Sequence, residues 1–91
     1  LILSEYSKID LVFLDGDHKK EETIVLVQQL LPCLSSKGLI VIHDIHYSRE
    51  MMEAWEFVQG FPEVSVSVST FTMGFLFVSE GLSRQRFRMR R

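Results

Sequence analysis

The sequence predicts an α/β fold in which two parallel strands are joined by crossover helices and followed by an antiparallel closing hairpin. Two apolar runs, residues 9–14 and 39–45, have the length and continuity of strands buried in a parallel sheet. A helix-length segment follows each run, which predicts right-handed parallel crossovers. Two more strand-like runs, residues 64–69 and 73–80, are separated by a short turn. The expected order is β-α-β-α-β-β.

The first connection predicts a helix that begins near residue 19. Its apolar residues recur at helical spacing: Ile24, Val27, Leu30, Leu31 and Leu34. Glu21 and Glu22 suit the helix dipole in the first turn. Pro32 should close or kink the helix, and residues 35–38 have the composition of a turn.

The second connection predicts a helix that is N-capped by Ser48, with Met52, Trp55 and Val58 on one face. Met51, Met52 and Trp55 could line a substrate pocket, although such residues at helical spacing more often belong to the core. After this helix, valine and serine alternate strictly over residues 64–69. That alternation predicts a strand with one buried and one wetter face.

The composition indicates one small domain with a core, because 46% of the 91 residues are apolar. No apolar run approaches the about 20 residues that span a membrane, so we expect no membrane partner. Cys33 is the only cysteine, which excludes an internal disulfide and a multi-cysteine metal site. We expect a cytoplasmic setting.

Charge is distributed unevenly along the chain. Residues 1–80 have seven more acidic than basic side chains, whereas residues 81–91 contain five arginines and no acid. Such a tail could contact nucleic acid or anionic lipid. Phe87 and Met89 alternate with arginines, however, which also fits an edge strand. Because residues 1–80 are acidic overall, we interpret residues 81–91 as a basic C-terminal tail or edge strand with no nucleic-acid partner.

Polar residues lie at the ends of both parallel strands: Asp15, Gly16, Asp17 and His18 at the first, and His43, Asp44 and His46 at the second. Ligands bind beyond the carboxyl ends of strands in such sheets. Asp15 and Asp44 could approach one point there, where two carboxylates repel unless a cation lies between them. A divalent ion fits that arrangement, and nearby histidines would favour Mn²⁺, Fe²⁺ or Zn²⁺ over Mg²⁺. Histidine could also act as a general base.

These residues also have purely structural interpretations. Asp and His at strand ends often satisfy loop backbone groups, and Asp17 could N-cap the first helix. His43 and Asp44 are neighbours in a strand and therefore face opposite sides. Only one of them would face the site unless the backbone turns there.

Three segments resemble the C-terminal half of a class I S-adenosylmethionine-dependent methyltransferase, most closely the bacterial small-molecule O-methyltransferases. They are "DLVFLDGDHKKEE", "LLPCLSSKGLIVIHDI" and "VSVSVSTF…MGFLFV". The resemblance covers residues 9–80 and implies the fourth to seventh strands of a Rossmann-like methyltransferase sheet. It makes residues 1–80 the C-terminal half of such a domain.

The resemblance also implies roles for individual residues. In the metal-dependent members, residues at the positions of Asp15 and Asp44 hold the metal, here Mg²⁺ or Mn²⁺. Asp15 would also lie near the methionine part of the cofactor. His43 stands where a second carboxylate is common, so without a metal His43 or His46 would be the base that deprotonates the hydroxyl of a small-molecule substrate.

The family's glycine-rich turn and ribose-binding acid have no counterpart here, since the five glycines include no G-x-G pair. We therefore expect S-adenosylmethionine to bind the full-length parent, and these 91 residues to be inactive alone. The apolar edge of residues 9–14 would be bare. We expect it to self-associate or to pair with a missing N-terminal half.

Two other functions are compatible with parts of the sequence. "VFLDGD" resembles the opening of haloacid-dehalogenase-type phosphatases, with Asp15 as nucleophile and Asp17 as acid, although His18 and Lys19 depart from that family's pattern. The chain could also be a non-enzymatic assembly module that associates through an exposed sheet edge.

Overall fold

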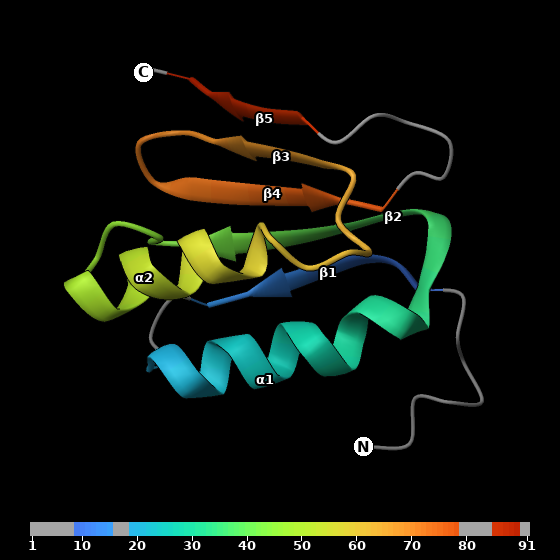
Figure 1. Ribbon diagram of the computed structural model, residues 1–91, viewed down its shortest axis with the longest axis horizontal. Coiled ribbons are helices and arrows are strands. Elements are labelled where there is room, and N and C mark those ends of the chain that lie inside the picture. The colour runs from blue at the N-terminus through green and yellow to red at the C-terminus, as the bar shows by residue number, and fades with distance from the viewer. Residues whose placement is uncertain (1–8, 16–18, 79–84, 90–91) are drawn as a thin grey trace.

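The computed structural model describes residues 9–15, 19–78 and 85–89. The chain forms, in order, β1 (Ile9–Leu14), α1 (Lys20–Leu30), a short 3-10 helix η2 (Leu31–Cys33), β2 (Leu34–His43), α2 (Arg49–Val58), β3 (Val66–Ser69), β4 (Met73–Phe77) and β5 (Gln85–Arg88) (Figure 1). The α/β class is therefore confirmed. Neither helix of the described ranges is long and apolar enough to cross a membrane.

All five strands form one mixed sheet in the order β1-β2-β4-β3-β5. β1 and β2 are parallel, and β4 runs antiparallel to both of its neighbours, β2 and β3. The predicted parallel pair and closing hairpin are thus both present. β5 lies at the far edge, parallel to β3. The carboxyl ends of β1, β2 and β3 consequently share one edge of the sheet.

Both helices cover the same face of the sheet, where they pack against each other (Figure 1). The two crossovers progress across the sheet in the same direction, and right-handed crossovers then place their helices on one side. The core lies between these layers. Its central side chains, all at most 1% exposed, are Val27, Ile40, Ile42, Ile45, Met51, Val58 and Leu76.

The opposite face of the sheet is apolar, and no described element covers it. Strand register aligns one row across all five strands: Phe13, Val41, Phe75, Val68 and Phe87. Leu11 and Phe13 on β1 are each 61% exposed, whereas Val12 and Leu14 pack against the core. The expectation that residues 9–14 are covered on both faces was therefore wrong for this chain, because its helices supply only one layer.

The valine–serine alternation gives β3 two unlike faces, but the serines are on the more buried one. Ser67 is 1% and Ser69 8% exposed, while the strand's valines are half-buried on the other face. Ser67 Oγ donates to Gln59 Oε1 at 2.8 Å, and Gln59 Nε2 donates to the Trp55 carbonyl oxygen at 3.2 Å. This hydrogen-bonded chain explains how hydroxyls are accommodated beneath α2.

β2 begins at Leu34, earlier than predicted, and the segment 35–38 that was expected to be a turn lies within it. Ile9 is paired with Leu34 and Leu11 with Leu39, so β2 advances by five residues over the stretch in which β1 advances by two. The turn-forming residues therefore make an irregularity in the strand. Gly38 is required there, because a Cβ at this position would lie 2.6 Å from Leu34 Cβ.

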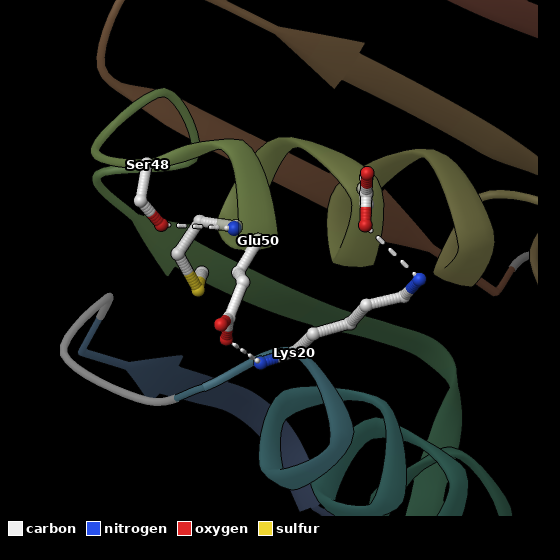
Figure 2. A network of polar contacts seen from close by, with 5 residues as sticks. Lys20, Ser48 and Glu50 are labelled. Carbon is white, nitrogen blue, oxygen red and sulfur yellow. Dashed lines mark hydrogen bonds and ion pairs between the residues drawn. The ribbon is translucent and has the colours of Figure 1, made fainter.

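The N-termini of the two helices are capped differently. Ser48 Oγ accepts a hydrogen bond from the Met51 backbone at 3.1 Å, which confirms the predicted cap of α2. The N-cap of α1 is Lys19, whose side chain makes no cap bond. Instead, Figure 2 shows Glu50 pointing from α2 to the backbone nitrogen of Lys20, 3.3 Å from its Oε1. The proposed cap residue Asp17 lies outside the described residues.

The core-facing side of α2 differs in one position from the prediction. Its buried residues are Met51, Ala54, Trp55 and Val58, whereas Met52 is 49% exposed. The i, i+3, i+4, i+7 spacing of the four buried residues is that of a single helical face. Met52 lies beside that face and not at its centre.

Candidate active site

Asp15 follows β1 directly at the carboxyl edge of the sheet and is exposed. Leu14 is paired with Ile42, so the parallel register brings Asp15 level with His43 at the end of β2. The predicted meeting of these two strand ends is thus present at the backbone level. Asp17 and His18 lie outside the described residues, and their predicted roles stay predictions.

The backbone turns at Asp44, which has φ 60° and is the only non-glycine residue with positive φ among those described. Aspartate tolerates this left-handed conformation better than most residues. The Thr72 carbonyl oxygen holds the turn by accepting from the backbone nitrogens of Asp44 at 2.6 Å and Ile45 at 3.3 Å. The chain thereby leaves β2, and consecutive residues no longer need to face opposite sides.

As a result, the side chains of His43 and Asp44 approach each other. His43 Nδ1 lies 3.3 Å from Asp44 Oδ2, and the two side chains are 40% and 42% exposed. The His43 ring also packs against Phe13 at a centroid distance of 6.2 Å. In the neutral imidazole, a proton on Nδ1 that is shared with the carboxylate leaves a lone pair on Nε2. Asp44 can therefore orient His43 as a base.

His46 is held by a different acceptor. Its Nδ1 lies 2.8 Å from the Phe71 carbonyl oxygen, and its ring stacks on the Phe71 ring at a centroid distance of 6.3 Å. A carbonyl oxygen can only accept, so Nδ1 must be the protonated nitrogen of this hydrogen bond. In the neutral ring Nε2 then has the lone pair, and His46 is exposed to solvent. His46 is thus arranged to accept a proton from a ligand.

The described residues do not assemble a complete metal site. No group of three or more His, Cys, Asp or Glu side chains within them is placed to hold a metal ion. Of the two predicted ligands, Asp44 already contacts His43. Two carboxylates alone leave most positions of a hard cation to water or substrate. The ligand roles of Asp15 and Asp44 stay predictions.

Sequence reasoning missed the backbone groups that organise this edge. The carbonyl oxygens of Phe71 and Thr72 fix His46 and Asp44, and both belong to the turn between β3 and β4. Carbonyl groups carry no side-chain signature, so no pattern in the sequence could single them out. Only the pairing of β4 with β2 brings this turn to the end of β2.

Comparison with known proteins gives one match. Residues 2–45 match the profile of a protein family described as a methyltransferase domain. This segment is slightly under half of the chain and includes β1, α1 and β2 together with Asp15, His43 and Asp44; it ends before His46. No curated protein matches, and no solved structure does. The match supports a methyltransferase domain, and the mixed sheet with parallel β1 and β2 is consistent with a partial Rossmann-like methyltransferase fold.

Proposed function

We propose that the chain is part of an S-adenosylmethionine-dependent methyltransferase that acts on the hydroxyl group of a small molecule. The observation that carries the proposal is the family match across β1, α1 and β2, since these elements deliver Asp15, His43 and Asp44 to one sheet edge. The match favours this function over the phosphatase alternative. S-adenosylmethionine would supply an activated methyl group as the second substrate.

In this proposal the chain's residues position the acceptor and remove its proton. His46 Nε2 accepts the hydroxyl proton while Nδ1 stays bonded to the Phe71 carbonyl oxygen. The deprotonated oxygen would be the methyl acceptor, and S-adenosylmethionine, when bound, would give up its methyl group to that oxygen and leave as S-adenosylhomocysteine. The pair of His43 and Asp44 is the alternative base, with Asp44 orienting the ring. Asp15 is assigned to contact the methionine part of the methyl donor.

The family's glycine-rich turn has no counterpart in this sequence, whose five glycines include no G-x-G pair. We therefore propose that polypeptide outside these 91 residues supplies the turn, and that the 91 residues alone do not transfer methyl groups. Contact with that polypeptide would run along the unpaired edge of β1. We also propose a cytoplasmic setting, consistent with the free thiol of Cys33.

The test compares two proteins, the 91-residue chain and the product of the longest reading frame that contains it. Each is incubated with methyl-labelled S-adenosylmethionine and a panel of hydroxylated small molecules. We expect label transfer by the longer product alone. Transfer by the 91-residue chain would disprove its predicted inactivity, and no transfer by either protein to any acceptor would contradict the proposed function.

A second function, as an assembly module, is favoured by the exposed edge strand. Among the strands that the structure describes, β1 pairs with β2 alone, and its Leu11 and Phe13 are each 61% exposed. Such an edge can recruit another chain. Light scattering of the 91-residue chain should show association that Phe13→Lys reduces, whereas Val25→Lys on the surface of α1 should leave it unchanged. A monomer at high concentration, or equal effects of both variants, would exclude this function.

A further inference from the structure

A cavity of about 500 Å³ lies on the helix-covered side of the molecule, between α2, the edge strand β5 and its neighbour β3. It extends to the carboxyl edge of β2. The residues that shape it include His46, Met52, Trp55, Ser69, Arg86 and Arg88. Its volume is in the range of small-molecule sites. None of the roles assigned above uses this cavity as a whole.

The register of the sheet explains why a hollow forms here. On the face towards the helices, Gly74 of β4 is paired with Ser69 of β3, and Ser69 is paired with Arg88 of β5. Trp55 fills the space above Gly74, where a Cβ would meet its ring at 2.5 Å. Beyond Trp55, Ser69 is too small to fill the gap. The cavity therefore results from the order of side chains across the sheet, in which the small residues Gly74 and Ser69 are followed by Arg88.

The walls of the cavity combine an apolar side with a cationic side. Trp55 and Met52 come from α2 and offer a flat ring and a thioether, as expected of an apolar ligand contact. Arg86 Nη1 is already paired with Glu56 Oε2 at 2.8 Å. Arg88 makes no ion pair with any other described residue. The cavity wall thus has one guanidinium in excess of its carboxylates.

We propose that this cavity binds a small organic carboxylate with a flat apolar body. Arg88 pairs with the carboxylate, because a guanidinium matches a carboxylate with two parallel hydrogen bonds. The apolar body lies against Trp55 and Met52. His46, at the edge of the cavity, is one residue common to this site and to the candidate active site. The binding site stands without methyl transfer, since it depends on the packing of α2 against the sheet and on the pairing of β5 with β3.

Trp55 is the only tryptophan of the chain, so its fluorescence reports binding directly. The probe is benzoate, titrated into the 91-residue chain, with benzamide as the neutral ligand of similar shape. We expect a saturable change with a dissociation constant of about 1 mM for benzoate. Benzamide should bind about tenfold more weakly, because it cannot pair with a guanidinium.

Two arginine-to-glutamine variants test whether Arg88 contacts the carboxylate of benzoate. Arg88→Gln should weaken benzoate binding about tenfold, and Arg49→Gln, an exposed arginine that does not line the cavity, should leave it unchanged. Circular dichroism checks that both variants are folded, and Arg88→Glu, which reverses the charge of an exposed side chain, should abolish binding.

Three results would overturn the proposal. They are the absence of saturation up to about 10 mM benzoate, equal binding of benzoate and benzamide, and equal effects of the Arg88 and Arg49 substitutions. Tighter binding of inorganic phosphate than of benzoate would show that the site selects a compact anion, which contradicts the apolar part of the assignment.

Discussion

His46 and Phe71 are joined twice, by a hydrogen bond of 2.8 Å from the imidazole Nδ1 to the carbonyl oxygen and by stacking of the two rings. The pairing connects the loop after β2 to the turn between β3 and β4. It fixes which nitrogen carries the proton, and in the neutral ring it leaves the lone pair on Nε2. A histidine held in this way has the tautomer that the proposed role as proton acceptor requires.

The first prediction concerns this histidine. In the longer methyltransferase that we propose, His46→Gln should lower the methyl-transfer rate about 10²- to 10⁴-fold, the range of general-base catalysis. The neighbouring Tyr47→Phe is the control, since Tyr47 is 73% exposed and has no assigned role. Initial rates with labelled methyl donor measure both. Equal rates for the His46 variant and the control would remove His46 from the mechanism.

Gly74 should not tolerate a side chain. A Cβ there would lie 2.5 to 2.8 Å from three ring atoms of the buried Trp55, so Gly74→Ala should lower the free energy of unfolding by about 1–3 kcal/mol. At Gly60 a Cβ would meet no atom closer than 3.4 Å. Gly60→Ala should therefore have a much smaller effect. Urea unfolding measures the free energy of unfolding of both variants. Comparable decreases for Gly74→Ala and Gly60→Ala would contradict the close packing of Trp55 on Gly74.

The turn at Asp44 should favour glycine over alanine. Both Asp44→Gly and Asp44→Ala remove the carboxylate that contacts His43, but only glycine adopts φ 60° without strain. Asp44→Ala should thus be less stable than Asp44→Gly by about 1 kcal/mol in urea unfolding. At Glu63, which lies outside the left-handed region, the same pair of substitutions should show no such preference for glycine. The same preference at both positions would argue against the turn.

The buried hydrogen bond between Ser67 and Gln59 should contribute to stability. Ser67→Ala leaves Gln59 Oε1 without its 2.8 Å partner, which should cost about 1–3 kcal/mol. Ser36→Ala, at an exposed position of β2, should change the free energy of unfolding by less than about 0.5 kcal/mol. If Ser67→Ala were as neutral as Ser36→Ala, the serine face of β3 would not be the buried one.

Local patterns in the sequence were sufficient for most of the fold. The bounds of β1, the Ser48 cap and the closing hairpin follow from signals that span only a few residues. The turn composition of residues 35–38 was misleading, because pairing of Leu34 with Ile9 extends β2 through them. The burial of Ser67 could not be predicted either, since its partner Gln59 is supplied by another element.

The candidate site was predictable in outline. Asp15, His43 and Asp44 follow strands whose parallel pairing could be inferred, and the structure places these strands side by side. The sequence indicated that His43 and Asp44 could both face the site only if the backbone turned there. The turn itself could not be predicted, because the φ of Asp44 depends on the Thr72 carbonyl oxygen. Met52 and Trp55, which the sequence offered as possible pocket residues, do line the cavity beside His46, but its arginine side was not foreseen, because it depends on the register between β3 and β5.

The most direct test of the account is the methyl-transfer rate of the proposed longer methyltransferase with Asp15→Asn and, as its control, Asp10→Asn. Both aspartates are exposed on the same segment of chain, but Asp15 stands at the carboxyl edge, whereas Asp10 lies near the other end of β1, where it accepts a hydrogen bond from Ser35 at 2.6 Å. We predict a loss of at least about 100-fold for Asp15→Asn and less than about twofold for Asp10→Asn. Equal rates for the two variants would contradict a methyltransferase site at the carboxyl edge of β1 and β2.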